Sequence, residues 1–272
     1  MRPSFASVSA ILISFLMLSS VFVLEHSSEA FEELDDVSSD LIEFTSARGS
    51  SKSFIASGGS STQSIDPSQI IADPNGGWII GSEYNTTLTF GTQTLQRTSP
   101  YNAGEFFLAT IDDTGTWQSL FGADHSFGAG GLSYLTDINV DIGGEILVTG
   151  YFYGEISFPG GQGNPPSIIA NTNSGFHFEG FLAKADPMGN WLWANSFSTL
   201  VNGSGEFSIT SGIEIDFAGD VFVTGEFQGD TDFGGFSLNV SNTQVFAAKY
   251  SGMTGSLDWV VSGGGIGTNR II

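Results

Sequence analysis

Asp216-Phe-Ala-Gly-Asp220-Val-Phe-Val-Thr-Gly225 decides the fold, because near copies of this stretch occur twice more in the chain. The copies are Asp73-Pro-Asn-Gly-Gly-Trp-Ile-Ile-Gly81 and Asp141-Ile-Gly-Gly-Glu-Ile-Leu-Val-Thr-Gly150. Each copy is an acidic turn with glycines that leads into an apolar strand ending in glycine. Recurrence about every 70 residues predicts a repeat protein.

The sequence around each copy predicts four strands in a fixed order, with the opening stretch supplying the second strand. The predicted units cover about residues 65–123, 134–200 and 210–264. In each unit a tryptophan marks the fourth strand. An aromatic residue and a glycine between strands two and three predict an additional hairpin, at Phe90, Phe158 and Phe233.

Both faces of the second strand are apolar in the predicted units. In the middle copy, Ile146 and Val148 alternate with Leu147 and Tyr151. Because successive side chains of a strand point to opposite faces, this sheet has to be covered on both sides. Stacking four-stranded sheets face to face provides that cover.

The composition favours an all-β chain and narrows the choice of partners. The 272 residues include 37 glycines and 24 phenylalanines, which suit tight turns and short buried strands. Seven Lys and Arg residues against 29 Asp and Glu residues give a formal net charge of −22. This charge argues against nucleic acid and against an anionic membrane surface, since both require clustered cations. No cysteine is present, and a secreted chain without disulfides favours a prokaryotic source.

The first 52 residues predict export rather than a folded domain. Residues 1–30 contain Arg2, then an uncharged stretch and small residues before a cleavage site, which indicates a secretory signal. An uncleaved anchor is the alternative, because the apolar run over 5–24 is long enough to span a membrane. Both readings place the rest of the chain outside the cytoplasm. Residues 31–52 form an acidic, serine-rich spacer, with a short helix over 38–46 as a further expectation.

The order of motifs resembles that of the SBBP-type β-propeller repeat of bacteria and archaea. The shared order is Asp-x-x-Gly, a Val-Thr-Gly strand, Phe-Gly, Ala-Lys and a turn with Gly and Trp, and the match covers about residues 53–272. The third copy matches most fully, with Asp216, Gly219, Thr224, Gly225, Ala248, Lys249, Gly255 and Trp259. The first copy departs from the pattern at Ile80 and Thr110. The resemblance implies one blade per repeat and an extracytoplasmic setting, and no particular chemistry.

The ends of the repeat region predict about three complete blades in an open or truncated array. Residues 53–59 resemble a fourth strand, as in 259–264, and Asn269-Arg-Ile-Ile272 resembles a first strand. Propellers close with at least about four blades. The sequence therefore predicts a fragment of a longer protein of about six to eight blades.

Carboxylates in glycine turns are the candidate metal ligands, because hard cations prefer oxygen donors. Such turns occur at Asp112, at Asp216 and at Asp230-Thr-Asp232, and the last pair is the calcium candidate. The alternative is that each aspartate accepts hydrogen bonds from its own turn. None of the turns matches the full EF-hand calcium loop. No other cofactor is predicted.

No motif with a catalytic mechanism is present. His125 and His177 are predicted to be solvated loop residues, because neither has a partner at the spacing of a metal site or a triad. Glu179, Glu206 and Asp124 lie outside the repeat pattern and have no supporting motif. The sequence therefore predicts no catalytic residue.

Two kinds of residue recur and are predicted to be structural. Lys184 and Lys249 occupy equivalent strand positions, which favours a structural role, either ion pairs with nearby acids or exposed strand ends. Trp117, Trp193 and Trp259 recur near one position, which favours packing over sugar stacking, whereas Trp191 is the tryptophan without a counterpart.

The resulting prediction is an exported, non-catalytic β-propeller-type module for binding or scaffolding. Variable loops over 123–134 and 159–178 would hold an unidentified protein or glycan at the rims. One alternative is a secreted hydrolase or lyase that uses a central channel. Another is a spacer for a domain removed by truncation.

Overall fold

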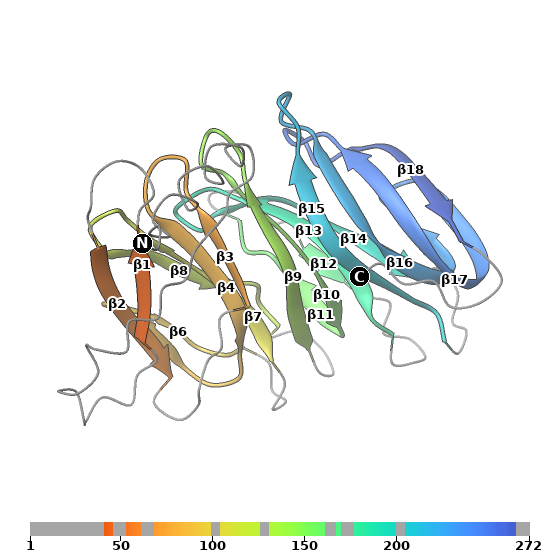
Figure 1. Cartoon of the computed structure of the whole chain (residues 1–272). Coiled ribbons are helices and arrows are strands. Elements are labelled where there is room, and N and C mark those ends of the chain that lie inside the picture. Colours follow the sequence, from red (N-terminus) through yellow and green to blue (C-terminus); the bar gives the residue numbers. More distant parts are fainter. Residues whose placement is uncertain are drawn as a thin grey trace, which may run out of the picture. The chain divides into compact units, whose positions relative to one another are not determined.

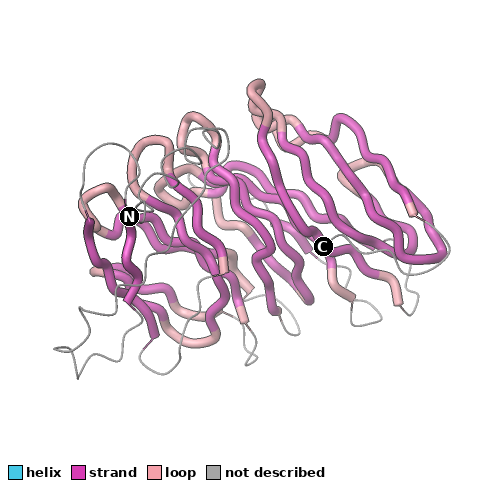
Figure 2. Tube along the Cα trace, in the orientation of Figure 1, coloured by secondary structure: helices cyan, strands magenta, loops and turns pink. Residues whose placement is uncertain are grey.

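The chain is all-β in the part that the structure describes. The computed structural model describes residues 41–45, 53–60, 68–98, 104–125, 131–160, 167–169, 177–199 and 205–264. Within these ranges the chain forms strands and turns and no helix (Figures 1 and 2). The all-β prediction is confirmed. The predicted signal over 1–30 and the predicted strand Asn269–Ile272 lie outside the described residues.

Each repeat forms four antiparallel strands in the predicted order. In the first repeat they are β3 (Gln69–Ala72), β4 (Trp78–Tyr84), β7 (Glu105–Ile111) and β8 (Trp117–Gly122). In the second they are β9 (Leu132–Val140), β10 (Ile146–Tyr153), β13 (Glu179–Ala185) and β14 (Trp191–Thr199). In the third they are β15 (Phe207–Ile215), β16 (Val221–Asp232), β17 (Ser237–Tyr250) and β18 (Leu257–Gly263).

The second and third repeats are not separate blades but parts of one eight-stranded sheet that curls like half a barrel (Figure 1). The link is a short antiparallel pairing of β14 with β16, Ser198 with Asp232 and Thr199 with Thr231. The prediction of separate four-stranded blades is corrected at this point. The reason is the length of β16, which continues past an irregularity at Phe227/Gly229 and reaches the end of β14.

The predicted hairpins between strands two and three are present. They are β5 (Leu88–Phe90) with β6 (Gln93–Leu95), β11 (Glu155–Ser157) with β12 (Ser167–Ile169), and the outer parts of β16 and β17. Phe90, Phe158 and Phe233 at these hairpins are all buried, each in a different core cluster. The hairpin phenylalanine therefore seals one side of each repeat.

The segment before the repeats holds two strands. β1 (Leu41–Thr45) pairs with β2 (Ser53–Ser60), and β2 pairs with β5 to complete a four-stranded sheet. The expected short helix over 38–46 is therefore wrong. A run that contains Ile, Phe and Thr favours extended backbone, and a partner strand that lies later in the sequence supplies the missing hydrogen bonds.

The core confirms that the second strand is covered on both faces. Ile146 and Val148 of β10 pack with Ile79 of β4 in one cluster. Leu147 packs with Val223 of β16 in another. Alternate residues of β10 therefore join it to the repeat before and to the repeat after.

The aspartates of the acidic turns accept hydrogen bonds from the backbone of their own turn. Asp216 Oδ1 accepts hydrogen bonds from Ala218 N at 2.8 Å and Asp220 N at 3.0 Å. Gly219 in this turn has φ of +84°, a conformation that glycine adopts at little cost. Asp141 and Asp112 accept the same pair of backbone hydrogen bonds. The turn-capping interpretation of these aspartates is confirmed.

Candidate functional site

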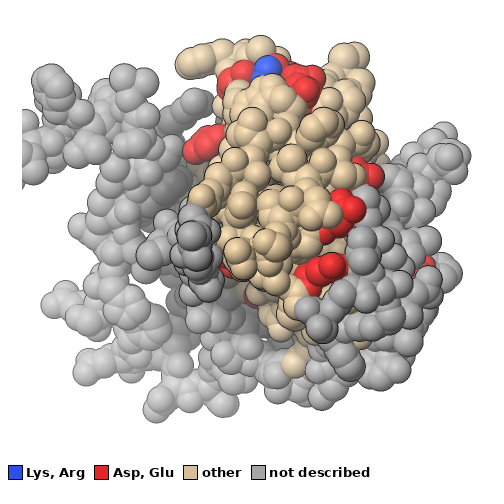
Figure 3. All heavy atoms as spheres, turned by 90° about the vertical axis from the view of Figure 1, so that its right-hand side faces the viewer, with Lys and Arg blue, Asp and Glu red and all other residues tan. Residues whose placement is uncertain are grey.

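The third repeat exposes one face of its sheet, which we call the terminal face and define by Phe222, Lys249, Trp259 and Val261. Phe222 pairs with Lys249 across β16 and β17, and Lys249 pairs with Trp259 across β17 and β18. Cross-strand partners share one side of a sheet. Trp259 is 42% exposed and Val261 56%. The view from this end of the molecule is mostly uncharged, with a basic group between acidic groups at its top edge and further acidic groups toward its sides (Figure 3).

Lys249 is fixed between Phe222 and Trp259 in the cross-strand row of the terminal face. Its Nζ lies 2.6 Å from Asp220 Oδ2, 3.6 Å from Asp258 Oδ2 and 5.7 Å from the centre of the Phe222 ring. The Trp259 ring meets the Phe222 ring edge-on at 6.1 Å between centres. The hydrogen bond with Asp220 raises the pKa of Lys249, so the cation persists at neutral pH. The predicted ion pair of Lys249 is confirmed.

The second repeat carries the same row of residues, and there the row is covered. Leu147 pairs with Lys184, and Lys184 pairs with Trp193. Lys184 Nζ and Trp193 Nε1 both donate to the carbonyl oxygen of Gly252, at 3.0 and 3.1 Å. Trp193 is only 8% exposed, against 42% for Trp259. The row therefore holds a turn of the following repeat.

Lys184 also forms a buried ion pair, as predicted. Its Nζ lies 2.9 Å from Asp141 Oδ2 and 2.6 Å from Glu145 Oε2. Burial acts to lower the pKa of Lys184, but the hydrogen bonds with Glu145 and Asp141 outweigh burial and raise it. Lys184 is therefore charged when it meets the Gly252 carbonyl.

The strand pairing shows which tryptophans are equivalent between repeats, and the result differs from the prediction. Trp191 pairs with Ala185 and Trp117 with Ile111, so these two are equivalent. Trp193 is equivalent to Trp259 through the lysine that each faces. The prediction that Trp191 has no counterpart is wrong. The same irregularity occurs at the start of the fourth strand in all three repeats. Counting from the turn glycine would have given this equivalence, because Trp117 and Trp191 each follow theirs by two residues and Trp193 and Trp259 by four.

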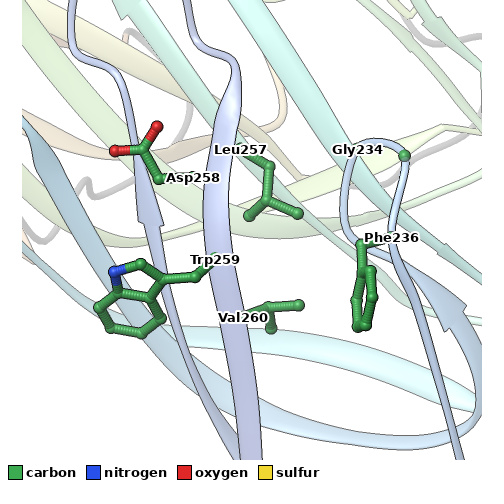
Figure 4. Close-up of a pocket in the computed structure, with 7 residues that line it drawn as sticks. Gly234, Phe236, Leu257, Asp258, Trp259 and Val260 are labelled. Carbon is green, nitrogen blue, oxygen red and sulfur yellow. The ribbon is translucent and has the colours of Figure 1, made fainter.

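A pocket of about 380 Å³ adjoins the terminal face. Its lining includes the turn Gly234–Phe236 and residues 257–260 of β18. Leu257 and Val260 point toward Phe236, whereas Asp258 and Trp259 point to the other side of the strand (Figure 4). The pocket is therefore lined by apolar side chains together with polar groups of the turn and strand, and its lining offers no pair of catalytic groups.

The calcium candidates lie on β16, next to this pocket. Asp232 Oδ1 accepts hydrogen bonds from Gly234 N at 2.9 Å and Gly235 N at 2.6 Å, so it caps the turn. Asp230 pairs with Asn239 in the β16–β17 ladder. Among the described residues, no group of three or more His, Asp or Glu side chains is placed to hold a metal ion. Calcium at Asp230 and Asp232 stays a prediction.

Both histidines are buried, which corrects the expectation that they are solvated. His125 is 1% exposed, and its Nδ1 lies 3.9 Å from Glu105 Oε2. His177 is 8% exposed, and its Nδ1 lies 2.9 Å from the carbonyl oxygen of Glu206. Segments that are distant in the sequence bury these loop residues, and this burial cannot be predicted from the neighbouring residues alone.

A buried polar cluster surrounds Glu105, and it was not predicted from the sequence. This fully buried carboxylate accepts hydrogen bonds from Tyr84 OH and Thr98 N, both at 3.0 Å. Burial, together with Glu105, raises the pKa of Tyr84. Glu179 begins the equivalent strand and is likewise buried, so it belongs to the repeat pattern after all. The motif Glu-x-Phe-Leu-Ala at 105 and 179, with Phe107 and Phe181 as its aromatics, would have revealed this.

The folded state is expected to lose stability at acidic pH because of the buried His125. Burial lowers the pKa of His125 below its ordinary value of 6.5, although Glu105 and Asp124 act in the opposite direction. The unfolded chain therefore takes up the proton first, and stability falls as the pH drops below about 6.5. Urea unfolding of the wild type and of His125→Phe between neutral pH and pH 5 should show a shallower decline for the variant. Parallel curves would contradict this assignment.

No protein-family model matches the chain, and no curated protein matches its sequence. Within the described ranges, no helix is long and apolar enough to cross a membrane. The predicted anchor over residues 5–24 lies outside those ranges.

Proposed function

We propose that this chain is an exported, non-catalytic binding or scaffold module that holds a partner polypeptide on the terminal face. Its four-stranded repeats resemble SBBP-type repeats in sequence, and the second and third are joined into one sheet rather than forming separate blades. Consecutive repeats pack face to face, and the aspartate turns recur in them. The partner is a protein rather than a glycan, and nucleic acid is excluded by the charge.

One observation favours a polypeptide as the partner. The row Phe222, Lys249 and Trp259 occupies the register positions of Leu147, Lys184 and Trp193. In the second repeat, the lysine and the tryptophan donate to a backbone carbonyl. The same donors on an exposed sheet suit another segment of backbone.

The hydrolase alternative has less support. A catalytic acid should occur once, whereas Glu105 and Glu179 recur at equivalent positions and are both buried. Burial away from solvent leaves no route for a substrate to reach them. The spacer alternative predicts that the terminal face has no partner.

A photoreactive residue tests the proposed function. The full chain with p-benzoylphenylalanine in place of Trp259 should form covalent adducts with protein in the cell-envelope fraction of the source organism. The same residue in place of Phe217, a fully exposed side chain in the turn before β16, should not. Adducts removed by glycosidases but not by proteases would indicate a glycan. Equal yields at both positions would contradict a binding role of the face.

A further inference from the structure

We propose that the terminal face binds the turn between β7 and β8 of a second copy of this chain, so that copies associate head to tail. This turn comprises Asp112–Thr116 of the first repeat. The inference rests on the proposed function and names the partner of the same face. Its argument comes from the two sheet-to-sheet contacts already present inside the chain.

A turn glycine lies on an aromatic ring at both internal contacts. An added Cβ at Gly189 would lie 2.7 Å from the Phe121 ring of the preceding repeat. An added Cβ at Gly255 would lie 2.8 Å from the Trp193 ring. Both glycines occupy the turn before the fourth strand, with φ of +88° and +71°. The second and third repeats therefore each place a glycine turn against the fourth strand of the preceding repeat.

The first repeat presents the equivalent turn. Gly115 has φ of +83° and stands before the fourth strand, as Gly189 and Gly255 do. Asp113, Thr114 and Thr116 in this turn are exposed. The turn closes with the same two backbone hydrogen bonds as the turn of Gly189, whereas the turn of Gly255 is one residue longer. Its surface is open to solvent.

The terminal face supplies the matching donors. Gly252, the acceptor for Lys184 and Trp193, follows Tyr250 by two residues, as Asp113 follows Ile111 in the first repeat. The Asp113 carbonyl is therefore the counterpart of the Gly252 carbonyl. Within the described residues, Trp259 Nε1 has no hydrogen-bond acceptor. The chain thus carries both halves of one interface, on its first and third repeats.

Two features limit the strength of this association. Leu88 and Phe90 of the β5–β6 hairpin already cover the adjoining apolar side of the first repeat, so the contact is confined to the turn and a small interface results. The net charge of −22 makes copies repel one another. Association should therefore strengthen with salt, as the Debye length falls from about 8 Å to about 3 Å between 0.15 and 1 M.

Sedimentation velocity of the purified full chain tests the proposal. The mean mass should rise with protein concentration, and it should rise further at high salt. Trp259→Ala and Gly115→Asn should each weaken association by about tenfold or more. Asparagine tolerates positive φ, so Gly115→Asn adds a side chain with little backbone strain. Circular dichroism and thermal unfolding confirm that both variants are folded.

Two substitutions serve as matched controls. Gly219→Asn has nearly the same backbone angle, φ of +84°, and an added Cβ there meets nothing within 4 Å. Phe217→Ala removes an exposed aromatic side chain outside the terminal face. Neither control should alter association.

Mixing the variants distinguishes this geometry from other assemblies. Each variant keeps one intact half of a head-to-tail contact, so an equimolar mixture of Trp259→Ala and Gly115→Asn should form mixed dimers that do not grow further. If only Trp259→Ala weakened association, the face would pair with itself and the proposal would be overturned. A monomer at every concentration and salt would also overturn it, while a photo-adduct in the envelope fraction would still uphold the proposed function.

Discussion

Gly225→Ala is expected to destabilise the third repeat by about 3 kcal/mol or more, because the added methyl group has no space. A Cβ at this position would collide with the carbonyl oxygen of Ile209 and lie 2.6 Å from the Phe246 ring. The first of these atoms is backbone of the adjacent strand β15, which cannot move without breaking its pairing with β16. The midpoint of guanidinium unfolding, followed by tryptophan fluorescence, measures the loss.

The control is a glycine in a strand with open space around it. Gly263 lies in β18, and an added Cβ there meets nothing within 4 Å, so Gly263→Ala should leave the midpoint nearly unchanged. The equivalent residue of the second repeat, Gly150, would collide with the carbonyl oxygen of Tyr134 and lie 2.7 Å from the Phe181 ring. Gly150→Ala should therefore resemble Gly225→Ala. A small loss for both would show that the adjacent strands yield easily.

Lys184→Ala is expected to cost about 2–4 kcal/mol, because it removes the partner of two carboxylates at a covered interface. Asp141 and Glu145 would lose their cation, and the Gly252 carbonyl would lose a donor. Burial tends to raise the pKa of Asp141, and the hydrogen bonds from Lys184 and the backbone outweigh it and lower the pKa. The variant should therefore also lose less stability than the wild type as the pH falls through the range in which Asp141 is protonated.

Lys249→Ala is the matched control, since this lysine has the same register position on an exposed face. Water solvates the freed Asp220 and Asp258 carboxylates, so the loss of stability should be much smaller than for Lys184→Ala. Thermal unfolding of both variants at neutral pH makes the comparison. Equal losses would mean that burial of Lys184 by the third repeat contributes nothing.

The repeats could be predicted from the sequence because each of them contains the same short-range interactions. An aspartate that caps its own turn, a glycine with positive φ and an alternating apolar strand are each readable from a few neighbouring residues, as at Asp216, Gly219 and Val221. The equivalence of Lys184 and Lys249 was predicted in the same way, and both form the expected ion pairs.

The candidate site could not be predicted from the same patterns. Trp193 and Trp259 have equivalent positions, yet Trp193 is covered by a turn of the third repeat, whereas Trp259 is exposed among the described residues. His125 and Glu105 are 20 residues apart and meet only through folding.

By itself, the sequence determined an all-β chain of recurring four-stranded units, because strand period and turn chemistry are properties of short segments. The tertiary structure decided how those units join, through the pairing of β14 with β16, and which copy of a repeated row faces solvent. Identical local patterns specify identical local structure, whereas burial depends on what packs against a surface from elsewhere in the chain. The terminal face is therefore a property of the assembled repeats, although each of its residues belongs to the repeat pattern.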